Sequence, residues 1–457
     1  MSTNVTNLKG VSNFQIIQQK NGKADITIKG SYIIDDDHKY VWLKIVSEDY
    51  NLSVVDWKMA DFIDDSHFTI TFKDVPAGGL YRIESGIMTN INGCTWALRG
   101  DSIFHFGIGD LFIIAGQSNS AGYSRTPIED TMELGVHLYR NSQNWDIASH
   151  PMNDSTNSVH EVNSEGANPG HCPYLAFGKK MKRFLGYPIG LIQTSRGGSA
   201  LSSWNTNEEG ELYANMINVV SDCTDNDMHV AGILWYQGCT DADLHLTDTY
   251  FDRFKLFTEN VRRDFKDKTL PIYTVQLNKI LDIGNTPRDL SWGAIREIQR
   301  QIAIKIPNVF IVPTIDLGLS DAIHNNSLAN ISIGERLANV ALSETYKKLP
   351  SAKAPNLSKA TKTSDNEITF SFENVVGFIT TIEAPYVLAQ FDISINGAKA
   401  NVQSYSSHDN KIIISLDTNV IGKTEISYCN NAFVHQIVPY DVGTGIPVLA
   451  FSITELF

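Results

Sequence analysis

The chain of 457 residues is 42% hydrophobic, and 51 acidic against 37 basic side chains give it a formal net charge of −14. This length exceeds what one hydrophobic core usually holds, so several domains are expected. Nucleic acid and anionic membrane surfaces are excluded as partners, because they are bound through clustered Lys and Arg. The sequence also contains no apolar run long enough to cross a membrane.

Residues 1–106 are predicted to form an N-terminal β-sandwich module. Apolar and polar side chains alternate in short segments, for example at 24–29 and 68–72, and the sequence PAGG at 76–79 predicts a turn. Alternation with a period of two places one face of each strand in a core. The first residues lack a charged start followed by an apolar core, so we expect no secretory signal in the given chain.

Residues 107–348 are predicted to form an α/β domain whose parallel sheet is covered by helices on both faces. Apolar strands alternate there with helical segments, the strands at 109–116, 188–193 and 233–236 and the helices at 173–185, 250–266 and 290–305. A Pro-rich segment follows at 349–355, and alternating strands such as 411–416 then resume. This pattern predicts a C-terminal β module over 349–457.

The strand at 109–116 runs directly into Gly116-Gln117-Ser118-Asn119. Glycine supplies the backbone freedom of a sharp strand-to-helix turn, so Ser118 is expected at the carboxyl end of a buried strand. A hydroxyl is a poor nucleophile unless a base accepts its proton and a third group orients that base. Asp321 and His324 are three residues apart and can supply both from one turn.

Acyl transfer also requires hydrogen-bond donors aimed at the oxygen that becomes negatively charged. Gly197 and Gly198 follow the strand at 188–193 in a Gly/Ser-rich loop, where backbone amides are not shielded by side chains. Gln237 follows the strand at 233–236, and its side-chain amide is a further candidate donor. The strand ends and the Asp/His pair are therefore expected to converge on one rim of the sheet.

These segments resemble the four sequence blocks of the SGNH hydrolases, specifically the sialate O-acetylesterase-like branch. The matching segments are Gly109 to Asn119, Ser195 to Ser199 with Trp204, Trp235 to Gly238, and Asp321 to His324. The resemblance covers the central domain strongly and both flanks weakly. It implies a flavodoxin-like three-layer α/β/α hydrolase domain, flanked by β-sandwich-like modules, that needs no cofactor or metal.

By the same resemblance, Ser118 is the nucleophile, His324 the general base and Asp321 the residue that orients it. The amides of Ser118 and Gly198, or of its neighbour Gly197, form the oxyanion hole with Gln237. The expected substrate-binding residues are Gln117, Asn119, Arg196, Trp204, Trp235, Tyr236 and Arg296. The aromatic side chains among them either stack on a sugar ring or pack the core, and Arg296 with Trp292 and Gln299 either borders the site or packs a helix face.

Cys239 departs from the family pattern, because relatives usually carry Glu at this position. We expect its thiol to pack in the core rather than to act as a second nucleophile, and Asp321 then carries the acid role alone. Asp241, Asp243 and His245 read as a solvated loop, and no histidine spacing predicts a metal site. His171 is left between a substrate contact and a histidine satisfied within its loop.

The expected activity is removal of acetyl groups from sugar hydroxyls, as in sialate or acetylated xylan, through an acyl-enzyme. The alternatives are a broader SGNH esterase, lipase or thioesterase and, more distantly, an inactive carbohydrate-binding module. The five cysteines are scattered and odd in number, which suggests no disulfide framework and favours a reducing cytoplasm, with extracellular or phage-associated use left open. The sequence does not indicate the oligomeric state.

Overall fold

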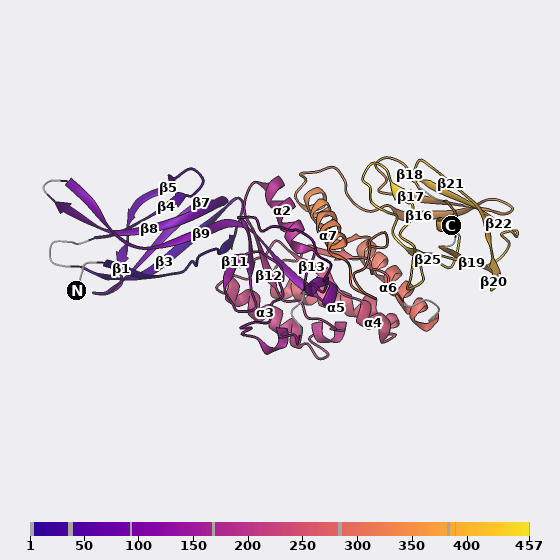
Figure 1. Cartoon of the computed structure of the whole chain (residues 1–457), viewed down its shortest axis with the longest axis horizontal. Helices are drawn as coiled ribbons and strands as arrows, with labels where there is room; N and C mark the ends of the chain where they lie inside the picture. Colours follow the sequence, from indigo (N-terminus) through magenta and orange to yellow (C-terminus); the bar gives the residue numbers. More distant parts are fainter. Residues whose placement is uncertain are drawn as a thin grey trace.

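The computed structural model describes residues 4–34, 40–91, 94–166, 170–281, 286–381, 384–388 and 390–456. An N-terminal group of strands, a central region rich in helices and a C-terminal group of strands follow one another along the long axis (Figure 1). The mixed α/β fold predicted from the sequence is confirmed. In the described ranges, no helix has both the length and the hydropathy needed to span a bilayer.

The N-terminal strands enclose a core of their own. Alternation in β3 buries Ile26 and Ile28, and Phe68, Ile70 and Phe72 of β7 pack on them. One sheet has the order β1-β3-β7-β6, and β4, β5, β8 and β2 join the longer sheet through β9. The strands are β1 Asn4–Lys9, β2 Ile16–Gln18, β3 Lys23–Ile33, β4 Tyr40–Ser47, β5 Leu52–Met59, β6 Asp61–Phe62, β7 His67–Pro76, β8 Gly78–Ile91 and β9 Cys94–Gly116.

The central sheet has the order β11-β10-β12-β9-β13-β14-β15, and all neighbours in it are parallel except the antiparallel edge pair of β10 and β11. Its inner strands read as continuous apolar runs because both faces are covered. The remaining strands are β10 Val136–Tyr139, β11 Trp145–Ile147, β12 Ile189–Gln193, β13 Gly232–Tyr236, β14 Ile272–Val275 and β15 Val309–Val312.

Two hydrophobic cores lie on the two faces of this sheet. One contains side chains of α3, α5 and α6, and the other contains side chains of α2 and α7. The helices are α1 Ser118–Ala121, α2 Tyr174–Leu185, α3 Glu211–Cys223, α4 Cys239–Asp243, α5 Thr247–Asp264, α6 Thr286–Lys305 and α7 Ser327–Val340, with 3-10 turns at Glu161–Asn163 and Leu201–Trp204 and a π turn at Ala341–Thr345.

Strand β9 belongs to both the N-terminal and the central regions, because it pairs with β8 and β2 in its first part and with β12 and β13 in its second. The predicted boundary between residues 106 and 107 falls inside this strand. At its middle, the buried Asp110 carboxylate accepts hydrogen bonds from Gln18, Gln19, Tyr187 and Tyr346. These bonds tie the end of β2 to the central domain.

The C-terminal strands pack around a further apolar core. Their sheets have the orders β16-β17-β22-β21, β18-β24 and β20-β19-β23-β25. The elements are β16 Asn356–Ser364, β17 Glu367–Glu373, β18 Ile379–Thr380, α8 Ala384–Leu388, β19 Phe391–Ile395, β20 Ala398–Ala400, β21 Val402–His408, β22 Lys411–Leu416, β23 Thr424–Tyr428, β24 Tyr440–Asp441 and β25 Phe451–Ile453.

Candidate active site

The turn after β9 can be built only with glycine at its first position. Gly116 has φ +126°, and a Cβ atom there would lie 2.2 Å from the carbonyl oxygen of Tyr236. The close approach of β9 and β13 at this point lets the chain turn at once into α1. Ser118 is therefore the first residue of that helix, at the carboxyl end of the central strand of the sheet.

Ser118, His324 and Asp321 form a continuous chain of hydrogen bonds. Ser118 Oγ lies 3.0 Å from His324 Nε2, and His324 Nδ1 lies 2.8 Å from Asp321 Oδ2. The serine is 8% exposed, whereas the Asp321 side chain is 51% exposed. This geometry allows the imidazole to accept the serine proton while the carboxylate fixes its tautomer.

Backbone amides hold the Asp321 carboxylate in place. Its Oδ1 accepts from the amides of Ile323, at 2.9 Å, and His324, at 2.8 Å. Partial burial raises the pKa of Asp321, but the two amides and the imidazole outweigh it, so the pKa lies below its ordinary value. The residue is thus an anion that faces Nδ1 of His324.

Two asparagines attach the histidine loop to the sheet. Asn119 Oδ1 accepts from the amide of Asn325 at 3.0 Å, and Asn278 Nδ2 donates to the carbonyl of Ile323 at 2.7 Å. Asn119 is only 2% exposed. The prediction that Asn119 binds substrate is wrong, because its side chain is used to join the nucleophile turn to the loop of the general base.

Gln117 has a similar structural use. It is buried, its Oε1 accepts from the amides of Gly238 and Thr240, and its Nε2 donates to Thr240 Oγ1. These bonds join the nucleophile turn to the turn after β13. The expected substrate contact of Gln117 is therefore corrected to a contact between two turns of the protein.

Two backbone amides are candidate donors to the oxyanion. Gly198 is exposed, has φ +68°, and has nothing within 4 Å of its would-be Cβ. The Ser118 amide is the first of α1, where N–H groups lack an intrahelical acceptor. The neighbouring Gly197 amide is already used, because it donates to Glu165 Oε1 at 2.8 Å. Of the two glycines, Gly198 is the available donor.

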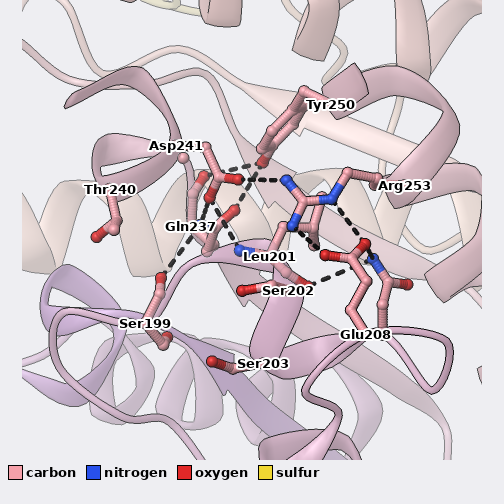
Figure 2. A network of polar contacts seen from close by, with 12 residues as sticks. Ser199, Leu201, Ser202, Ser203, Glu208, Gln237, Thr240, Asp241, Tyr250 and Arg253 are labelled. Carbon is pink, nitrogen blue, oxygen red and sulfur yellow. Dashed lines mark hydrogen bonds and ion pairs between the residues drawn. The ribbon is translucent and has the colours of Figure 1, made fainter. Parts of the chain in front are cut away.

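Gln237 does not fit the oxyanion role predicted for it. The residue has no exposed surface, and its Nε2 donates to the carbonyl of Ser199 at 3.2 Å and to Asp241 (Figure 2). Its Oε1 accepts from Tyr250. Both amide hydrogens are bonded to other groups of the protein. The side chain therefore supports the glycine loop at Ser199 and has no hydrogen left for an oxyanion.

Asp241 is the centre of this buried network (Figure 2). Besides Gln237, it accepts from the Leu201 amide at 2.9 Å and from Arg253 Nη1 at 3.0 Å, and Arg253 in turn binds Glu208. Burial raises the pKa of Asp241 despite these donors. The expectation of a solvated loop at Asp241 is wrong, whereas Asp243 pairs with Arg288 at the surface and His245 bonds to Ser291.

The aromatic residues predicted near the site lie in the core. Trp204 and Trp235 pack edge to face with ring centroids 5.2 Å apart, and Tyr236 accepts from Asn325 Nδ2 at 3.1 Å. Each of the three is at most 1% exposed. Of the two interpretations left open by the sequence, core packing is confirmed, and their assignment to substrate binding is corrected.

Arg296 is also buried, at 1% exposure. Its guanidinium donates to the carbonyls of Leu277, Asn278, Cys429, Asn431 and Ala432, and burial lowers its pKa to about 10. It joins the end of the central sheet to the C-terminal region, so its predicted substrate role is wrong. Trp292 and Gln299 are also buried. Trp292 donates to the carbonyl of Asn278, and Gln299 accepts from the Leu277 amide and donates to the carbonyl of Gln237.

Arg196 is partly exposed and donates to the Ser164 carbonyl.

Cys239 lies in the core, as expected. It is 1% exposed, and burial raises the pKa of its thiol far above the ordinary value. Its Sγ lies 3.9 Å from Asn278 Oδ1. A thiol that stays protonated and enclosed is neither an attacking group nor a substitute for the glutamate of relatives.

The sequence reasoning missed Tyr123 and Glu165. The Tyr123 ring stacks on His324 with centroids 5.0 Å apart at 27°, and its hydroxyl donates to Glu165. For Tyr123, the signal in the sequence was an aromatic residue five positions after the nucleophile. Glu165 reaches the site only through the fold of the segment that follows β11, so no local pattern marked it.

A second group of acid and histidine lies apart from the serine. Asp130 Oδ2 accepts from His150 Nε2 at 3.1 Å and His171 Nε2 at 3.0 Å, and Lys179 Nζ lies 2.6 Å from Oδ1. Burial raises the pKa of Asp130, but these donors outweigh it and hold the pKa below its ordinary value. His171 bonds to Asp130 through Nε2, but its buried Nδ1 has no hydrogen-bond partner within the described residues, so the histidine is only half satisfied by its loop and neither interpretation is confirmed.

One potential ligand atom from each of Asp130, His150 and His171 lies within 4.8 Å of the other two, so the group has to be considered as a metal site. His150 Nδ1 accepts from the Cys172 amide at 3.4 Å, so the proton of the neutral ring is on Nε2, the atom that faces Asp130. Lys179 supplies the positive charge that the carboxylate needs. The donor set therefore fits a hydrogen-bonded ion cluster better than a metal site.

Comparisons with known proteins indicate the family and the fold of the chain. A family model described as carbohydrate esterase, sialic acid-specific acetylesterase, matches residues 108–343. Sialate O-acetylesterases of Homo sapiens and Pongo abelii are each 22% identical over 257 residues, 46% of this chain and 48% of theirs, so the chain spans about half the length of these curated relatives. A carbohydrate acetylesterase structure from Xanthomonas citri is 18% identical with TM-score 0.63, covering 97% of this chain and 98% of that one, and so shares the fold.

Proposed function

The chain belongs to the carbohydrate esterase family of sialic acid-specific acetylesterases, and we propose that it removes acetyl groups from sugar hydroxyls through an acetyl-serine intermediate. The proposal includes an SGNH-type, flavodoxin-like three-layer domain at 107–348 between β modules at 1–106 and 349–457. The observation that carries the proposed reaction is the hydrogen-bonded chain from Ser118 through His324 to Asp321.

In the proposed acylation step, Ser118 Oγ attacks the carbonyl carbon of the acetyl ester while His324 Nε2 accepts the hydroxyl proton. The carbonyl oxygen becomes an oxyanion, which the amides of Ser118 and Gly198 stabilise. When the tetrahedral intermediate collapses, the bond to the sugar oxygen breaks and His324 returns the proton to that oxygen. The sugar leaves as an alcohol, and Ser118 carries the acetyl group.

Deacylation repeats these steps with water as the nucleophile. His324 accepts a proton from water, the resulting hydroxide attacks the acetyl carbon, and the same amides stabilise the second oxyanion. Collapse of this intermediate releases acetic acid, with the proton returned to Ser118. The Asp321 anion supports the imidazolium that forms in both halves of the reaction.

The test is acetate release by the purified chain from O-acetylated sialic acid, acetylated xylan oligosaccharides and 4-nitrophenyl acetate, with Ser118→Ala beside it. We expect release by the wild-type chain and its loss in the variant. Release from 4-nitrophenyl esters that increases with acyl length would instead favour a broader esterase, lipase or thioesterase. Glycan binding without turnover of any ester would overturn the proposal in favour of a binding module.

The sugar panel also separates the two substrate classes that we propose. Arg196 is the partly exposed cation of the glycine loop, and a guanidinium binds carboxylates through paired N–H groups. A preference for O-acetylated sialic acid that is reduced in Arg196→Gln would support a contact of this residue with the sugar carboxylate. An equal loss on neutral xylan oligosaccharides would assign Arg196 to the shape of the loop instead.

A further inference from the structure

A single carboxylate outside the predicted motifs contacts two parts of the candidate active site. Glu165 Oε1 accepts from the amide of Gly197 at 2.8 Å, and Oε2 accepts from the hydroxyl of Tyr123. The first contact is to the loop of the oxyanion hole, and the second is to the ring stacked on His324. Glu165 thus connects the loop of the predicted oxyanion hole to the Tyr123 ring that packs on the general base, His324.

The contact to Gly197 determines the direction of the next amide. A Cβ atom on Gly197 would lie 2.6 Å from Tyr123 Oη and 2.8 Å from Glu165 Oε2, so this peptide is tightly enclosed. On the preceding side, the Arg196 amide donates to the Gly116 carbonyl at 3.0 Å. With these two amides fixed, the next N–H along the loop is that of Gly198, the predicted donor to the oxyanion.

The contact to Tyr123 supports the histidine from its ring face. The two rings are nearly parallel, at 27°, and the same imidazole approaches Ser118 through Nε2. Burial, together with the neighbouring Glu165 carboxylate, raises the pKa of Tyr123, so the phenol stays protonated and donates. A ring held at its hydroxyl limits the tilt of the imidazole that packs on it.

Glu165 is itself held by buried groups. Asn153, which has no exposed surface, donates from Nδ2 to Glu165 Oε1 at 2.6 Å, and its own Oδ1 accepts from Asn141 at 2.6 Å. The Glu165 amide donates to Ser155 Oγ at 2.8 Å. The carboxylate is therefore fixed before any substrate arrives, which is the requirement for preorganised catalysis.

We propose that Glu165 is a positioning residue of the esterase reaction, holding the Arg196–Gly197 peptide that precedes the Gly198 amide of the oxyanion hole and the Tyr123 ring against His324. The inference rests on the proposed function. It assigns no contact with substrate to Glu165, because both of its oxygens are bonded to the protein. Loss of the side chain therefore slows the chemical step more than it weakens substrate binding.

The experiment measures kcat and KM for 4-nitrophenyl acetate and the rate at which diethyl 4-nitrophenyl phosphate phosphorylates Ser118. The variants are Glu165→Ala, Glu165→Gln, Tyr123→Phe and Glu161→Ala, the last an exposed carboxylate of the same segment. Glutamine retains an oxygen for Gly197 and a polar group for Tyr123. Circular dichroism and thermal melting establish that each variant is folded.

We expect Glu165→Ala to lower kcat and the phosphorylation rate by about 10- to 100-fold with KM within about threefold, since a misplaced group costs up to about 10² in rate. Glu165→Gln and Glu161→Ala should stay within about threefold of wild type, and Tyr123→Phe should fall between. A folded Glu165→Ala that reacts at the wild-type rate overturns the inference, as does an equal loss in Glu165→Gln or Glu161→Ala. If wild type reacts with neither compound, the proposed function fails and the inference with it.

Discussion

Two of the groups in which an aspartate binds histidine differ in which ring nitrogen faces the acid. Asp321 binds Nδ1 of His324, so Nε2 remains for Ser118. Asp130 binds Nε2 of both His150 and His171, and the Nδ1 of His150 accepts from a backbone amide. The first arrangement leaves a basic nitrogen next to a hydroxyl, whereas the second uses the same residue types to neutralise a buried carboxylate.

The two groups also differ in surroundings. The Asp321 side chain is 51% exposed, and the Asp130 side chain is 8% exposed and faces Lys179. A buried carboxylate needs its lone pairs satisfied, and a ring nitrogen that donates to it is then not free to accept a proton. Proximity of acid and histidine is therefore a poor guide to catalysis without the identity of the facing nitrogen.

The largest expected effect breaks the first group at its reactive end. Ser118→Ala and His324→Ala should each lower kcat on the best acetyl ester by about 10⁴ to 10⁶, because loss of a nucleophile or base removes the covalent route. Steady-state rates with matched circular dichroism spectra measure this. In contrast, His171→Gln should keep kcat within about threefold, and an equally inactive His171→Gln would contradict the distinction between the groups.

Asp321→Asn tests the facing nitrogen directly. The remaining oxygen would stay with the amides of Ile323 and His324, which would turn the NH₂ group toward Nδ1. The ring would then carry its proton on Nε2 and could not accept from Ser118, so kcat should fall by about 10² to 10⁴ with little change in melting temperature. Retained activity with a lower melting temperature would refute this role.

Asp130→Asn should have the opposite profile. Removing the carboxylate leaves the Lys179 ammonium without its counter-charge, and breaking such a pair costs about 3 kcal/mol in free energy of unfolding. We expect the urea midpoint to decrease while kcat at a temperature below the transition changes less than about threefold. A large kcat loss in a fully folded variant would assign this group to the reaction.

The pH dependence of stability distinguishes the groups without a change of activity. Burial lowers the pKa of His150 below its ordinary 6.5, although Asp130 opposes this and His171 and Lys179 add to it. Below pH 6.5 the unfolded chain therefore binds a proton that the folded chain does not, and stability falls as pH falls. Melting temperatures from pH 8 to 5 should decline less steeply in His150→Gln, and an unchanged slope would contradict this.

The smallest expected effect is that of Cys239→Ala. The thiol is buried near the catalytic loop and its pKa is raised by burial, so it supplies no thiolate. We expect kcat within about threefold of wild type and a loss of about 1 kcal/mol in unfolding free energy, the usual cost of a small core deletion. Severe loss of turnover in a folded variant would show that the position retains a catalytic use.

The sequence predicted the triad because its residues follow local patterns. Ser118 ends an apolar strand at a glycine, and Asp321 and His324 lie within one turn. Strand order was not needed, since the carboxyl ends of parallel strands share an edge. The strands and helices of the central domain were predicted for the same reason, from continuous apolar runs and amphipathic segments.

Side-chain directions at the strand ends were not predictable in this way. Gln237 lies within a predicted motif and Arg296 lies on a helix beside the site, but both are buried. Their N–H groups donate to buried carbonyls and, for Gln237, to the Asp241 carboxylate. Whether a polar group faces substrate or protein depends on partners distant in sequence. Glu165 is the converse case, a residue without a motif that the fold brings to Gly197 and Tyr123.

The continuity of β9 has a mechanical consequence. Its 23 residues pair first with β8 and β2 and then with β12 and β13, and the strand ends two residues before Ser118 (Figure 1). Cutting the chain at residue 106 would remove most of the pairing between β8 and β9 and expose the cut end of the strand. Loosening of the pairing between β8 and β9 would therefore act on the same backbone that carries the nucleophile turn, and amide exchange along β9 should report one cooperative unit.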